Sequence, residues 1–136
     1  MARTFGDPYD IEIPLRTEWT EQVIFQDESG VPVAINSLKA RGQLREILDY
    51  DAYGNKEYGP SILDLTTEGV TPNIVIPNDS SGVMNITVSS VVIDSLSPDN
   101  LAKQVDFDIE FYTDDTDVEP ALAGTISFTQ RVTVPA

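Results

Sequence analysis

The stretch V-D-F-D-I-E-F-Y, residues 105–112, alternates apolar and polar side chains without interruption. Successive side chains of a β-strand point to opposite faces, so this period of two predicts a half-buried strand, whereas a helix would scatter both kinds of side chain around its axis. The apolar members that would share the core face are Val105, Phe107, Ile109 and Phe111. The members that would share the other face are Asp106, Asp108, Glu110 and Tyr112. We expect this strand to be the central one around which the chain is built.

Further short apolar segments predict seven to nine strands in all. The expected strands are residues 10–16, 19–27, 31–35, 40–50, 61–66, 73–77, 82–89 and 124–134, in addition to 105–112. Pro14 and Pro32 cannot donate a ladder hydrogen bond, so their segments are expected at sheet edges or, for residues 10–16, in pairing outside the domain. Residues 40–50 have a composition that also allows a helix, but the alternation at their start favours a strand with a bulge near Glu46.

The segments between these strands are rich in turn-forming residues. Residues 49–60 predict a long exposed hairpin loop, and residues 113–120 predict an acidic loop. Residues 89–96 are the one plausible helical turn, because Val92 and Leu96 are four residues apart and Ser89 or Ser90 can cap it. Many short strands with at most one short helix indicate an all-β antiparallel sandwich or barrel, with residues 10–136 as one domain and residues 1–9 as an N-terminal arm.

Composition disfavours several classes of function. The 136 residues include 8 Lys and Arg against 23 Asp and Glu, which gives a net charge of −15. Binding to nucleic acid or to an anionic membrane surface is therefore disfavoured, because both depend on cationic side chains. A basic protein partner, divalent cations and a simply solvated acidic surface all remain open. The N-terminus lacks the apolar region of a secretory signal and no stretch reaches the roughly 20 apolar residues of a membrane span, so we expect a soluble protein made in the cytoplasm.

The chain contains no histidine and no cysteine. The Ser-His-Asp and Cys-His arrangements cannot form, so the sequence predicts that the protein is not an enzyme; a carboxylate-based hydrolase is the remaining enzymatic alternative. No cofactor is expected. The stretch D-Y-D-A-Y-G at 49–54 resembles the start of a calcium loop but departs from it at Tyr53 and Pro60, and the acids at 114–117 are the other cation candidates.

Aromatic and apolar side chains in the arm, the first strand and the 49–60 loop are the candidate contact residues. Tyrosines offer apolar area with a polar end, which suits a protein or sugar partner, although they can also cover the rim of a sheet. The partner-binding set that we predict is Arg3, Phe5, Tyr9, Ile11, Ile13, Tyr50, Tyr53 and Tyr58. Trp19 is expected to be a core or rim residue.

The order of several motifs resembles a group of small tailed-phage structural proteins that includes the N-terminal domain of baseplate upper proteins. The matching segments are D-E-S-G-V-P-V-A-I-N-S-L-K-A-R-G-Q-L-R from Asp27 to Arg45, S-I-L-D-L-T from Ser61, G-V-M-N-I-T-V-S from Gly82, V-D-F-D-I-E-F-Y and G-T-I-S-F-T-Q-R-V-T from Gly124. The chain departs from that pattern in its V-D-F-D-I-E segment, where the family has a Tyr-Asp start. It also departs in its longer 49–60 loop and in lacking the C-terminal fibre-linking region.

The resemblance implies an immunoglobulin-like β-sandwich that serves as a structural component of a tailed bacteriophage virion. A tail or baseplate position is favoured over capsid decoration, and the family brings no catalytic residues. The partners would be other virion proteins in a homo-oligomeric or symmetric array, and the location would be the virion after synthesis in the host cytoplasm. The alternative is a carbohydrate- or receptor-binding module that uses the loop tyrosines.

Overall fold

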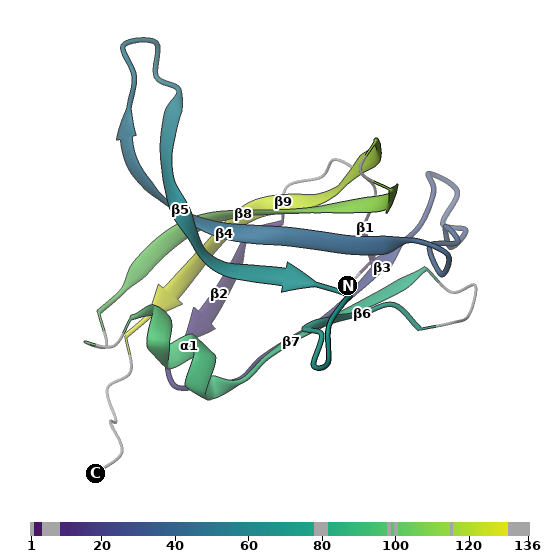
Figure 1. Ribbon diagram of the computed structural model, residues 1–136, viewed down its shortest axis with the longest axis horizontal. Helices are drawn as coiled ribbons and strands as arrows, with labels where there is room; N and C mark the ends of the chain where they lie inside the picture. Colours follow the sequence, from purple (N-terminus) through teal and green to yellow (C-terminus); the bar gives the residue numbers. More distant parts are fainter. Residues whose placement is uncertain are drawn as a thin grey trace.

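The computed structural model describes residues 2–3, 9–77, 82–97, 99, 101–114 and 116–130, and these are mainly β-structure. Two sheets lie one above the other, and the helix of the described chain lies at one end of the pair (Figure 1). The elements are β1 (Ala2–Arg3), β2 (Ile11–Pro14), β3 (Trp19–Phe25), β4 (Lys39–Tyr50), β5 (Lys56–Thr66), β6 (Ile74–Val75), β7 (Val83–Val88), α1 (Ser90–Leu96), β8 (Lys103–Asp114) and β9 (Asp117–Thr129). The expectation of an all-β chain with at most one short helix is confirmed.

The five-stranded sheet has the order β2-β9-β8-β4-β5, which places β8 in the middle. Its strands are antiparallel to their neighbours except β2, which runs parallel to β9. The four apolar side chains of residues 105–112 are all buried, because alternate side chains of β8 face the second sheet. The prediction of a central, half-buried strand is therefore confirmed.

Strand β2 forms one edge of this sheet, as Pro14 at its end predicts. After Pro14 the chain turns sharply: Arg16 has a φ of 66°, and the Thr17 hydroxyl donates a hydrogen bond to the Pro14 carbonyl at 2.5 Å. The predicted strand 10–16 thus pairs within the domain and is shorter than expected.

The four-stranded sheet has the order β1-β3-β7-β6. Strands β3 and β7 pair antiparallel from Trp19 opposite Val88 to Ile24 opposite Val83, whereas β1 runs parallel to β3. The predicted core face of β7 is confirmed, since Met84, Ile86 and Val88 are buried.

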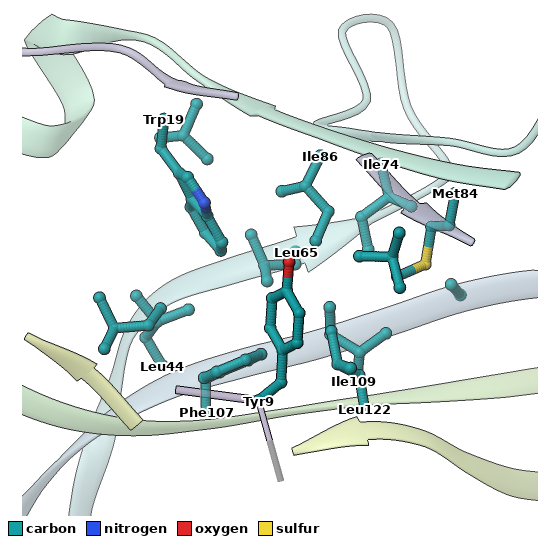
Figure 2. Close-up of a cluster of buried hydrophobic side chains, with 14 of the residues drawn as sticks. Tyr9, Trp19, Leu44, Leu65, Ile74, Met84, Ile86, Phe107, Ile109 and Leu122 are labelled. Carbon is teal, nitrogen blue, oxygen red and sulfur yellow. The ribbon is translucent and has the colours of Figure 1, made fainter. Parts of the chain in front are cut away.

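One hydrophobic core fills the space between the sheets. Figure 2 shows side chains from both sheets pointing toward one another, with Trp19, Ile86, Ile74 and Met84 on one side and Leu44, Phe107, Ile109 and Leu122 on the other. Phe25 of β3 and Phe111 of β8 meet edge to face, with ring centroids 5.2 Å apart and planes at 67°. Such aromatic pairs stabilise a fold by about 0.5–1.5 kcal/mol beyond the burial of their area.

Helix α1 confirms the predicted helical turn. The Ser89 hydroxyl caps it by accepting from the Val92 amide at 3.4 Å. Ile93 and Leu96 are the residues that the helix buries, while Val92 stays on its outer side. No helix in the described part of the chain is long and apolar enough to span a membrane.

Three predicted segments differ in the structure. Residues 31–35 form only an isolated bridge between Gln26 and Pro32 and no strand. The predicted loops 49–60 and 113–120 are largely strand, because β4 and β5 continue to Tyr50 opposite Lys56, and β8 and β9 continue to Asp114 opposite Asp117. The ends of these strands lack an alternating apolar pattern, so the sequence did not predict them. They are strand because each one forms hydrogen bonds with its neighbour.

Two described parts of the segment that was predicted as an arm contact the domain. Ala2–Arg3 pairs with β3, and residues 4–8 lie outside the described part of the chain. At Tyr9 the backbone amide donates to the Ala123 carbonyl at 2.9 Å, and the side chain enters the core (Figure 2). Gly124 allows this approach, because a Cβ there would overlap the Tyr9 backbone.

Candidate functional site

Strands β4 and β5 extend beyond the rest of their sheet as a two-stranded hairpin. Strand β4 pairs with β8 only from Lys39 to Arg45, yet it pairs with β5 as far as Tyr50 opposite Lys56. Residues 46–58, which we call the hairpin extension, rise away from the second sheet and stand clear of the two layers (Figure 1). Three register shifts between Leu44 and Asp49 mark the bend, so the predicted bulge near Glu46 is confirmed.

The tip of the hairpin extension is a tight turn held by Asp51. Its Oδ1 accepts hydrogen bonds from the amides of Tyr53 at 2.8 Å and Asn55 at 2.9 Å, and its Oδ2 accepts from the Asn55 side chain at 3.1 Å. Hydrogen bonds from the amides of Asn55 and Tyr53 lower the pKa of the Asp51 carboxyl. Gly54 takes a φ of 82°, which a turn of this kind needs. Asp51 therefore serves the turn, in the segment whose sequence resembles the start of a calcium loop.

The hairpin extension presents apolar side chains to solvent. Leu48 is 65% exposed, Tyr50 57% and Tyr53 91%, and Tyr58 is also exposed. The extension has no second sheet beneath it on which these side chains could pack (Figure 1). A group of large apolar side chains on a projecting element is typical of a surface that binds another molecule.

A hydrogen-bond network joins the base of the extension to the outer face of the sheet. The Lys56 ammonium and the Tyr58 hydroxyl both donate to Asp106 Oδ2 at 2.7 Å, and Thr125 Oγ1 lies 3.5 Å from Asp106 Oδ1. Partial burial raises the pKa of Asp106, but the hydrogen bonds from Lys56 and Tyr58 outweigh it and hold the pKa below its usual value. Asp106 thus ties the base of the hairpin extension to β8.

Arg45 reinforces the same base from β4. Its NH1 donates to the Gly59 carbonyl at 3.0 Å, and its Nε and NH2 donate to Gln43 Oε1 at 3.0 and 2.5 Å. Gln43 in turn donates to Asp64 at 3.3 Å. These contacts tie neighbouring positions of β4 and β5 together at the point where the hairpin bends.

A groove lies between the base of the extension and the outer face of the five-stranded sheet. Its first hollow has a volume of about 530 Å³ and is lined by Asp10, Gln43, Arg45, Lys56, Tyr58, Asp106, Phe107, Asp108, Ala123, Gly124 and Thr125. A second hollow of about 560 Å³ continues along the same face and is lined by Arg41, Gly42, Gln43, Asp64, Leu65, Thr66, Asp108 and Glu110. Gln43 and Asp108 line both hollows, so they lie at the middle of the groove.

Asp108 differs from the other acids of β8. In the described part of the chain, its carboxylate accepts no hydrogen bond from another side chain and forms no ion pair, whereas Asp106 binds Lys56 and Glu110 binds Arg41 Nε at 2.7 Å. Partial removal from water raises the pKa of Asp108, the Glu110 carboxylate raises it further, and Arg45 opposes both. Asp108 is exposed to solvent and lies near the like charge of Glu110, so a cation beside it would be favourable.

The predicted contact residues fall into two groups. Those of the hairpin come together, with Tyr50 and Tyr58 on its strands and Tyr53 at its tip. The segment that was expected to be a loop is instead a strand pair closed by a short turn at residues 51–55. Trp19, as expected, is a buried core residue.

In the N-terminal group, the described side chains Tyr9, Ile11 and Ile13 lie in or against the core and not beside the hairpin tyrosines. Tyr9 and Ile13 are 3% exposed and belong to the core, because alternate residues of this segment turn toward the second sheet. Ile11 is half-buried and packs against the core. Arg3 lies in β1, whose backbone pairs with β3, and Phe5 lies outside the described residues.

Apart from Tyr58, sequence reasoning missed the residues of the groove. The alternation of β8 placed Asp106 and Asp108 on the outer face, but it gave no signal that one would anchor the hairpin and the other would remain unpaired. Leu48 was missed because no apolar pattern surrounds it. In the described residues no group of three acidic, histidine or cysteine side chains is placed to hold a metal ion.

The comparisons with known proteins do not assign a family. No protein-family model matches the chain, and a search of curated proteins found no similar sequence. The likeness to phage structural proteins stays a prediction from the quoted motifs. The functional argument therefore depends on the fold, the hairpin extension and the groove.

Proposed function

We propose that this protein is an immunoglobulin-like β-sandwich that acts as a structural component of a tailed bacteriophage virion, in the tail or baseplate rather than on the capsid. It works by binding neighbouring virion proteins in a repeated, symmetric arrangement. The observation that carries the proposal is the hairpin extension, which projects Leu48, Tyr50 and Tyr53 beyond the two sheets. Interface cores are enriched in tyrosine, and a paired hairpin loses little conformational freedom when it binds.

The order of the strands supports the immunoglobulin-like assignment. Immunoglobulin domains place strands A, B, E and D in one sheet and strands C, F and G in the other. The order β1-β3-β7-β6 corresponds to the first set, and β9-β8-β4-β5 corresponds to G, F, C and an added C′ strand. The parallel pairing of β1 with β3 is a departure from the antiparallel arrangement of such sheets.

The phage setting is supported by the motif order along the chain. The quoted segments of the resemblance fall largely on strands β4, β5, β7, β8 and β9, which are four of the five strands of the larger sheet and one strand of the smaller sheet. The proposal assigns no chemical reaction to the protein, since the sequence holds no histidine or cysteine for nucleophile and base pairs. A module without such chemistry acts through the surfaces that it presents.

Particle assembly tests the proposal directly. Phage made without this chain is expected to show incomplete or missing tails by negative-stain microscopy and to lose infectivity. Complementation with the double variant Leu48→Ser/Tyr53→Ser is expected to reduce the copies per particle at least tenfold, measured by quantitative mass spectrometry. The matched control is Val70→Ser, because Val70 is fully exposed but lies outside the hairpin extension. Intact, infectious particles without the chain would refute the virion role.

A carbohydrate- or receptor-binding module is the second candidate, and the groove favours it. Its lining combines carboxylates, Arg45 and the Tyr58 ring, and groups of these kinds form the hydrogen bonds and apolar contacts of small-molecule sites. A glycan array probed with the purified protein, with and without calcium, tests this reading. Complete silence on the array would remove it.

A further inference from the structure

The hydrogen-bond donors around the first hollow of the groove are already engaged. Lys56 and Tyr58 donate to Asp106, and Arg45 donates to Gln43 and to the Gly59 carbonyl. These contacts hold in place the side chains of the hairpin base that line one side of the groove. An incoming ligand that mainly needs donors would have to break them.

Acceptors, in contrast, remain open on the floor of the groove. The Asp108 carboxylate accepts nothing from the other described side chains. Within the same described residues, Asp10 accepts through Oδ1, from the Thr125 amide at 3.0 Å, and not through Oδ2. The whole chain carries a net charge of −15, which attracts cations to such a site. The open groups therefore select a ligand that is positively charged and rich in N–H donors.

We propose that the groove binds an arginine or lysine side chain presented by a neighbouring protein, with Asp108 as its counter-ion and Tyr58 as the wall along which its stem lies. The inference rests on the proposed function for the source of that side chain. The first hollow, at about 530 Å³, lies within the range of about 300–1,000 Å³ that is typical of ligand sites, and it admits a long side chain with its flanking backbone.

The same face of the sheet already contains an arrangement of this kind. Arg41 Nε donates to Glu110 at 2.7 Å, and its guanidinium lies 4.4 Å from the centroid of the Tyr112 ring. This guanidinium thus contacts a carboxylate and an aromatic face at the same time. Arginine is suited to both contacts because its guanidinium is planar and weakly hydrated. Asp108 and Tyr58 offer the incoming side chain a carboxylate and a ring at the neighbouring hollow.

Asp108 and Tyr58 both line the first hollow. The pKa of Tyr58 is raised by its hydrogen bond to Asp106, by partial burial and also by the nearby charge of Asp108. A cation beside Asp108 would relieve the repulsion that this carboxylate has from Glu110. Arg45, which lines the same hollow, already offsets part of this repulsion, and its own hydrogen bonds go to Gln43 and the Gly59 carbonyl.

Peptide titration followed by NMR tests the inference on the isolated chain. The probes are the capped peptides Gly-Arg-Gly and Gly-Lys-Gly, and the neutral control replaces arginine with citrulline, which has nearly the same shape. The two cationic peptides are expected to shift the backbone amides of Asp108, Gly124 and Thr125, with affinity at least fivefold higher than that of the citrulline peptide. Equal shifts with all three peptides, or shifts confined to other regions, would overturn the inference.

Matched variants sharpen the test. Asp108→Asn is expected to weaken the arginine peptide at least fivefold, whereas Glu28→Gln removes one charge from an exposed turn and is expected to change its affinity less than twofold. Unchanged affinity in the Asp108→Asn protein would refute the role of Asp108, and an unperturbed amide spectrum certifies its fold. The two proposals can fail separately. If the peptides do not bind but particle assembly still depends on the chain, only this inference is refuted. If the peptides bind but particles assemble normally without the chain, only the virion role is refuted.

Discussion

Replacement of Tyr9 by alanine distinguishes a core residue from a contact residue. Its ring is 3% exposed, and its hydroxyl donates to Glu21 Oε2 at 2.5 Å. Removing a buried aromatic ring costs about 3–5 kcal/mol, and this range includes the cavity that remains. The hydrogen bond to a half-buried carboxylate adds about 1 kcal/mol. We therefore expect a loss of about 4–6 kcal/mol, a large share of the roughly 5–15 kcal/mol that stabilises a typical domain.

Urea denaturation followed by tryptophan fluorescence measures this loss, because Trp19 is the one tryptophan and is buried. Tyr53→Ala is the matched control, since the same side chain is removed from a position that is 91% exposed; its free energy of unfolding is expected to change by less than about 0.5 kcal/mol. Tyr9→Phe isolates the hydroxyl and is expected to lose about 1 kcal/mol.

The comparison of the two alanine variants can refute the reasoning. If Tyr9→Ala and Tyr53→Ala lower the free energy of unfolding by the same small amount, with unchanged dependence on urea, Tyr9 is not a core residue. A contact role for its side chain would then be restored.

Two further substitutions test the packing at β9 and the base of the hairpin. Gly124→Ala is expected to lower the free energy of unfolding by about 2 kcal/mol or more, measured by urea denaturation, because the added methyl group would overlap the Tyr9 backbone. Asp106→Asn is expected to lower it by about 1 kcal/mol at pH 7, since the hydrogen bonds from Lys56 and Tyr58 lose their charged acceptor and solvent screens part of the effect. Because the pKa of Asp106 is held below its usual 3.8, its stabilisation is complete above that pH and is lost as the pH falls through the folded-state pKa.

Each of these substitutions has a control. Gly59→Ala places a methyl group at ordinary contact distance from Leu48, so it is expected to cost clearly less than Gly124→Ala. Denaturation of wild type and the Asp106→Asn variant from pH 7 to pH 2 follows the charge effect. A stability difference that stays constant through the acidic range would contradict the role assigned to the Asp106 charge.

The sequence alone determined the all-β class, the central strand at 105–112 and the capped helix near 89–96. These features depend on local rules, because the direction of successive side chains follows from the backbone and a serine cap acts within a few residues. The burial of Phe107 and Phe111 and the edge position of Pro14 follow from the same rules. No partner strand needed to be known to predict them.

Only the tertiary structure decided which acidic side chain of β8 anchors the hairpin and which stays open to a ligand. Asp106 and Asp108 are equivalent in the sequence pattern, but the long-range pairing of β4, β5 and β8 brings Lys56 and Tyr58 over the first and leaves the second open. The same pairing turned a predicted loop into the hairpin extension. Contacts between residues about 50 positions apart depend on strand register and bend, and neither is encoded in a local alternation of side chains.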